Sequence, residues 1–104
     1  MRIPEKVKIG GNTYTVEITD KMKLGISNVS AEISYTDLII RISPQAQSKM
    51  EVDFVHELLH AVFFCLGYRE HDEKRIDELA HVLHMVAVDN PDLLAPAEVG
   101  KHES

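Results

Sequence analysis

Hydrophobic and polar residues alternate along the first part of the chain. Val7 and Ile9, and then Tyr14, Val16 and Ile18, are spaced by two residues, as on one face of a β-strand. The sequence GGN separates the two groups, and its glycines tolerate the positive φ angles of a tight turn. This pattern predicts a β-hairpin.

A second alternating segment, AEISYTDLIIRIS, covers residues 31–43. A polar break at TD divides its apolar positions, which are Ile33, Tyr35, Leu38, Ile40 and Ile42. We expect one or two further strands here, and hence an antiparallel sheet of three to four strands. Such a sheet has one apolar face, which a helix must cover.

A helix is predicted after the strands. Ser48 and Glu51 have the S-x-x-E spacing of a capping box, so the helix should begin near Lys49. Gly67 suits the left-handed position that follows a helix end. The apolar residues of this helix form one wide stripe, made of Val52, Val55, Leu59, Val62, Phe63 and Leu66.

A second helix is expected to begin around residues 71–73 and to end near the sequence VDNP, because Pro91 disfavours helix at the preceding residue. Its buried stripe should contain Ile76, Leu79, Ala80, Leu83, Val86 and Ala87. The predicted fold class is therefore α+β, with a small N-terminal antiparallel sheet packed on a central helix and followed by a second helix. We expect a single domain over residues 1–104, with a loose tail from about residue 96.

Composition narrows the function classes. The chain has 104 residues and a net charge of -6, the wrong sign for a protein that neutralises nucleic-acid phosphates. We expect no nucleic-acid partner, and the absence of a long apolar run argues against a membrane partner. The N-terminal sequence MRIPEKVKIGG does not resemble a signal peptide, so a cytoplasmic location is expected. Cys65 is the only cysteine, which excludes a disulfide within the chain, and its apolar neighbours predict burial.

The sequence HELLH in the first predicted helix carries the candidate chemistry. His56 and His60 are four residues apart, so their side chains project from one helix face and can share a metal ion. Glu57 is rotated by about 100° from His56, which is the position for a general base rather than for a ligand. H-E-x-x-H is the zinc-peptidase signature, in which zinc lowers the pKa of a bound water and the glutamate accepts its proton. Two histidines that only form hydrogen bonds at the edge of a core are the alternative interpretation.

A catalytic zinc needs a third protein ligand. Phe63 and Leu66 occupy the positions at which metzincins carry a glycine and a third histidine, so the ligand must come from later in the chain. Asp77 is the expected third ligand, because it lies mid-helix on the edge of the apolar stripe of the second helix. The alternatives are Glu73, His84, His71, Glu78 or no third ligand.

The order of sheet, HELLH helix, LG turn and acid-bearing second helix resembles the minimal gluzincin-type zinc peptidases, and among them the small phage-type and ImmA/IrrE-like metallopeptidases. The resemblance covers about residues 52–90, and HELLH is its one specific element. It implies zinc ligation by His56 and His60, catalysis by Glu57, and a third ligand on the following helix. It also implies a peptide substrate lying antiparallel to an exposed edge strand, for which residues 38–42 are the expected strand.

The leading hypothesis is thus a zinc-dependent metallopeptidase with peptide or protein substrates. His81, Tyr35 and Tyr68 are candidate donors to the oxyanion, although each has a packing role as the simpler explanation. A non-catalytic regulatory or binding module stabilised by zinc is the alternative function.

Overall fold

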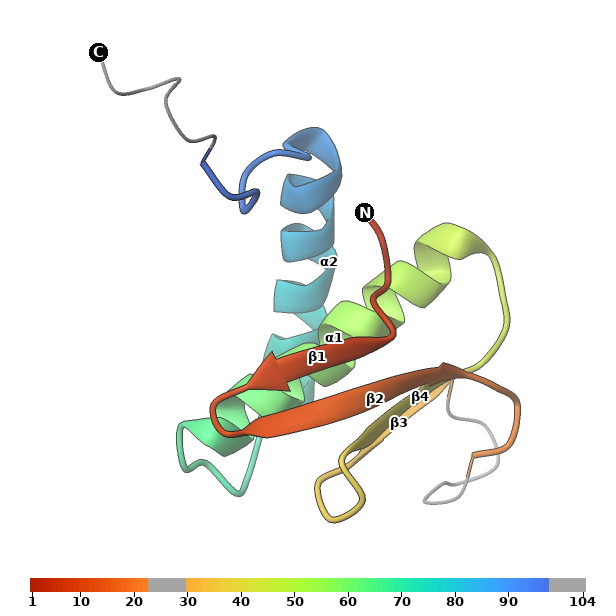
Figure 1. The fold of residues 1–104 in the computed structure, drawn as a ribbon, viewed down its shortest axis with the longest axis vertical. Helices are drawn as coiled ribbons and strands as arrows, with labels where there is room; N and C mark the ends of the chain where they lie inside the picture. The colour runs from red at the N-terminus through yellow and green to blue at the C-terminus, as the bar shows by residue number, and fades with distance from the viewer. Residues whose placement is uncertain (23–29, 98–104) are drawn as a thin grey trace.

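The computed structural model describes residues 1–22 and 30–97. The elements within these residues are β1 (Lys6–Ile9), β2 (Asn12–Ile18), β3 (Ala31–Ser34), β4 (Ile39–Ile42), α1 (Gln47–Cys65) and α2 (Glu73–Asp89). Figure 1 shows α1 lying along the sheet and α2 crossing α1 and extending beyond it. The predicted α+β class is confirmed, and none of the described helices is both long and apolar enough to cross a membrane.

The sheet has the strand order β1-β2-β4-β3. β1 and β2 form the predicted antiparallel hairpin, and Gly10 adopts a φ of 61° in its turn. β3 and β4 form a second antiparallel hairpin, but β4 pairs with β2 in parallel, with Thr15 opposite Ile39. The expected all-antiparallel sheet is therefore wrong at this one pairing, because the second hairpin joins β2 through the strand that runs in the same direction.

The same topology corrects the edge strand. β4 lies between β2 and β3, so the segment 38–42 is internal and its backbone groups are paired on both sides. β1 and β3 are the edges of the described sheet. A peptide that adds to the sheet beside α1 would pair with β3 instead.

The hydrophobic core lies between one face of the sheet and α1. Tyr14, Ile40 and Ile42 face the helix from the sheet, and Phe54 and Ala61 meet them from α1, all at most 3% exposed. Full burial of a large apolar side chain contributes about 1.5–3 kcal/mol. This layer therefore fixes how α1 lies on the sheet, and with it the direction in which the HELLH residues project.

The two ends of α1 differ from one another in how well local signals predict them. The helix begins at Gln47 with no side-chain hydrogen bond at its N-cap, so the predicted capping box is wrong. Glu51 accepts hydrogen bonds from Gln47 and His84 instead, which removes it from a capping role. At the other end Gly67 has a φ of 100°, as expected for the turn after a helix, whereas Cys65 is exposed rather than buried.

α2 has the predicted extent and a narrower buried face than expected. Asp72 caps its first turn by accepting a hydrogen bond from the Arg75 backbone N–H. Among the described elements α2 contacts only α1, so Ile76 and Ala80 alone are fully covered. Leu79 and Leu83, both predicted to be buried, are 38% and 44% exposed. The stripe predicted on α1 is also displaced, because Phe54 and Ala61 face the core while Leu66 is 67% exposed.

Candidate metal centre

His56 and His60 project from the same side of α1, as their spacing predicts. Their ring centroids are 5.0 Å apart, and their side chains are 21% and 12% exposed. Both rings therefore lie at the border between the core layer and solvent, where a small ligand can reach them.

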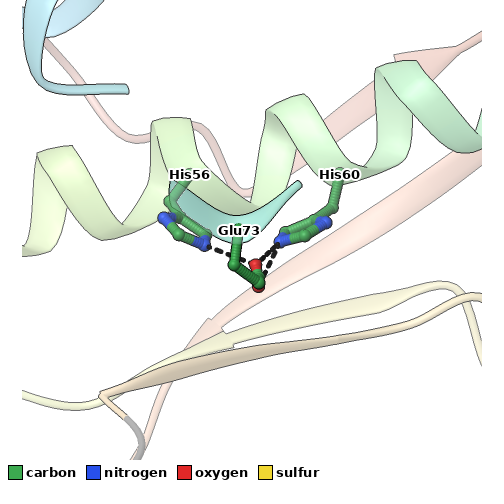
Figure 2. A group of neighbouring side chains, drawn as sticks. All are labelled: His56, His60 and Glu73. Carbon is green, nitrogen blue, oxygen red and sulfur yellow. Dashed lines mark hydrogen bonds and ion pairs between the residues drawn. The ribbon is translucent and has the colours of Figure 1, made fainter. Parts of the chain in front are cut away.

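Glu73, the first residue of α2, completes a group of three potential ligands. Its Oε2 atom lies 2.9 Å from Nε2 of His60 and 3.6 Å from Nε2 of His56. Figure 2 shows both imidazoles directed at this carboxylate from one helix face. One ligand atom from each residue lies within 4.8 Å of the other two, so these residues could hold a metal ion. Two imidazole nitrogens and a carboxylate oxygen form a donor set that suits Zn²⁺.

Asp77, the expected third ligand, lies outside this group. Its Oδ1 atom is 3.5 Å from Nδ1 of His56, on the ring nitrogen that does not face Glu73. His71 has the equivalent position at the other ring, where its Nδ1 is 2.7 Å from Nδ1 of His60. The geometry thus favours Glu73 as the third ligand and places Asp77 and His71 behind the two histidines.

The remaining candidates lie elsewhere on α2. His84 donates a hydrogen bond to Glu51 at 2.8 Å, near the opposite end of α1, and Glu78 is exposed. Helix projection from sequence put several of these residues on one edge of α2 but gave no longitudinal position. The packing of α2 across α1 supplies it in the structure, where the first residue of α2, Glu73, lies beside His60.

Glu57 is one of two buried carboxylates that line the site, the other being Asp53. Glu57 is 8% exposed and lines the same cleft as His56 and Glu73. Burial raises the pKa of Glu57 to about 8, and the carboxylates of Glu73, Asp53 and Glu32 add to the increase. A pKa in this range suits a group that must accept and return a proton near neutral pH, and a cation bound by the histidines would oppose the increase.

Burial has the opposite effect on His60. It lowers the pKa of the imidazole, as do the nearby His56 and His71 rings, and this outweighs the effect of the Glu73 carboxylate. A neutral imidazole is the form that binds a metal ion. The electrostatic setting of His60 therefore agrees with the donor set.

An open cleft of about 340 Å³ adjoins these residues. Its walls are Ser30 and Ala31 at the start of β3, Lys49, Asp53, His56 and Glu57 on α1, and Glu73 and Asp77 on α2. The edge strand β3 therefore borders the same space as His56, Glu73 and Glu57.

The three candidate oxyanion donors have different surroundings. His81 lies 2.8 Å from the Asp77 carbonyl on its own helix, and Tyr68 is 60% exposed against Phe63. Burial raises the pKa of Tyr35 to about 12, with a further contribution from Glu57, so its hydroxyl stays protonated in the neighbourhood of the site. The Tyr35 ring also stacks on Phe64, with centroids 4.1 Å apart, so it has a packing role as well.

Comparison with models of protein families, with curated proteins and with solved structures finds no match to this chain. The functional argument therefore depends on the residues and their geometry.

Proposed function

We propose that this protein is a zinc-dependent peptidase of the HExxH type, in which His56, His60 and Glu73 hold the zinc ion and Glu57 is the general base. The observation that carries the proposal is the convergence of the two Nε2 atoms on Glu73 within 4.8 Å, with the buried Glu57 in the same cleft. A chance grouping of surface acids is the weaker explanation, because two of the three residues are partly buried histidines.

The zinc ion would supply a Lewis acid that polarises the scissile carbonyl and makes a water molecule acidic. Glu57 accepts a proton from this water as its oxygen bonds to the carbonyl carbon. As the C–N bond breaks, Glu57 passes that proton to the departing nitrogen, so the products are a carboxylic acid and an amine. The Tyr35 hydroxyl donates to the oxygen on which negative charge develops.

The substrate is proposed to bind as an extended peptide along β3. Within residues 1–22 and 30–97 this strand has one neighbour, β4, so its outer edge can form backbone hydrogen bonds with an added strand. Ala31 of β3 lines the cleft together with His56 and Glu57, which would bring a bound peptide bond to the general base.

The test is to replace Glu57 with Gln. We expect the E57Q protein to keep its zinc while peptide hydrolysis falls by about 100-fold to 10,000-fold, the range that a positioned acid–base group provides. Zinc content would be measured by elemental analysis, and cleavage by mass spectrometry of a mixture of unstructured peptides. Glu78→Gln is the matched control, because Glu78 is an exposed carboxylate on α2.

Two results would contradict the proposal in different ways. Wild-type protein that contains no zinc after purification with added zinc would refute the metal site. Zinc-loaded protein that cleaves no peptide, or an E57Q variant that cleaves as fast as wild type, would refute the peptidase and favour a zinc-stabilised binding module.

A further inference from the structure

His71 lies in the turn between the helices and faces His60. The two Nδ1 atoms are 2.7 Å apart, and the ring planes are inclined by 23°. The other nitrogen of His71, Nε2, lies 2.9 Å from the backbone carbonyl oxygen of Tyr68. Both nitrogens of His71 are therefore engaged, one by a side chain and one by the backbone.

The chemistry of these contacts determines where the protons lie. A carbonyl oxygen can only accept a hydrogen bond, so Nε2 of His71 must carry a proton and donate it to Tyr68. In a neutral imidazole the second nitrogen then has a lone pair, which makes Nδ1 of His71 an acceptor. His60 must donate from Nδ1 to complete the contact. In a neutral His60 the lone pair is then on Nε2, which faces the Glu73 carboxylate, and these two acceptors are compatible only with a proton or a metal cation between them.

The turn holds His71 in this position. Gly67, with its φ of 100°, lets the chain reverse after α1, and residues 68–72 then return past the end of the helix. The ring of Phe63 meets the His71 ring edge to face, with centroids 5.7 Å apart at 88°. Phe63 is three residues after His60 on the same helix, so α1 carries both the histidine and the apolar support of its partner.

We propose that His71 is a positioning residue that fixes the tautomer and orientation of His60, so that Nε2 is the atom presented to the zinc ion. The inference depends on the proposed function only in taking His60 as a metal ligand. His71 lies outside the HELLH sequence, and the backbone carbonyl of Tyr68 holds it in place.

The experiment compares His71→Leu, which removes the acceptor, with His71→Asn, whose side-chain oxygen can occupy the place of Nδ1. Zinc affinity would be measured by competition with a chromophoric chelator. We expect H71L to weaken zinc binding by about 10-fold to 100-fold, the usual effect of losing a partner behind a metal-bound histidine. H71N should recover most of this loss. Val82→Ala is the control, because Val82 is 52% exposed on α2 and does not belong to the group formed by His56, His60 and Glu73.

A spectroscopic measurement makes the test independent of activity and of the variants' stability. Long-range proton–nitrogen correlation spectra of the zinc-loaded wild type should show His60 bound through Nε2, with a proton on Nδ1 that exchanges slowly with water. In H71L this proton should exchange faster.

Binding of zinc through Nδ1 of His60, or equal zinc affinity in wild type, H71L and H71N, would overturn the inference while leaving the peptidase proposal standing. Wild-type protein without zinc affinity would overturn both.

Discussion

Histidine and glutamate side chains meet at two places between α1 and α2, and the two contacts have opposite characters. At the first, which we call the anchor pair, Glu51 of α1 accepts a hydrogen bond from His84 of α2. At the second, which we call the ligand group, His56 and His60 of α1 face Glu73 of α2. The residue types are exchanged between the helices, and the ligand group has one imidazole more.

The difference lies in the balance of donors and acceptors. Glu51 is 6% exposed and receives N–H groups from His84 and Gln47, with the amino group of Met1 at 3.4 Å, so donors surround one acceptor. In the ligand group the outer nitrogens of both histidines have partners of their own, which directs two Nε2 lone pairs and a carboxylate at one point. Converging acceptors favour a cation, whereas the anchor pair is already satisfied.

The largest expected effect is on zinc affinity, and it distinguishes the proposed ligand Glu73 from Asp77, which lies behind His56. Glu73→Ala should weaken zinc binding by more than about 100-fold. The binding free energy of a protein zinc site is about 10–16 kcal/mol, and the loss of one ligand removes several kcal/mol of it. Asp77→Leu, which removes the carboxylate beside His56 and His81, should weaken zinc binding by about 10-fold. Chelator competition would measure both affinities. A larger loss in D77L than in E73A would mean that Asp77, rather than Glu73, completes the site.

A smaller effect is expected at the anchor pair, and on a different quantity. His84→Leu should lower the free energy of unfolding by about 1–3 kcal/mol, because Glu51 stays buried without its main donor. Urea denaturation of the metal-free protein would measure the change, with His81→Leu as the exposed-histidine control. Zinc affinity should be unchanged in H84L. A loss of zinc binding comparable to that in E73A would show that the two clusters are not independent.

The smallest expected effect is on the free energy of unfolding at acidic pH. Burial raises the pKa of Glu51, but hydrogen bonds from His84 and Gln47 and the charge of the Met1 amino group outweigh it, so the pKa lies below its usual value of 4.5. A carboxylate with a lowered pKa stabilises the fold above the unfolded value, and this contribution is lost as the pH falls through the folded value. Unfolding free energy should therefore decrease below about pH 4.5, and decrease less steeply in Glu51→Gln. An equal slope in wild type and E51Q, measured by urea denaturation between pH 3 and 6, would contradict this role.

Local sequence signals predicted most of the helices and strands, and they predicted that His56 and His60 project from one face of α1. The hairpin at Gly10, the end of α1 before Gly67 and the extent of α2 each depend on a few adjacent residues, whose effect can be judged without the rest of the chain. The parallel pairing of β2 with β4 could not be predicted in this way, because it depends on how two separate hairpins meet.

Local signals also could not determine which residue of α2 lies beside the two histidines. The angular projection of α2 placed Asp77 and Glu73 on the correct edge, but angle alone does not say which turn of α2 reaches which turn of α1. That position depends on the length of the turn and on the packing of Ile76 and Ala80 against α1. The expected capping box failed for a related reason, since the distant His84 binds Glu51.

The turn at Gly67 also has a consequence for how the chain folds. His60 and Glu73 are separated by 13 positions, so closing one short loop is enough to bring the ligand group together. The entropic cost of loop closure grows with length, and contacts between near neighbours in sequence form faster than strand pairings such as that between Thr15 and Ile39. The contact between His60 and Glu73 therefore closes a shorter loop than the parallel pairing of β2 with β4. The residues of the proposed metal site lie in one contiguous segment, 56–73, whereas the edge of β3 beside it depends on the slower assembly of the whole sheet.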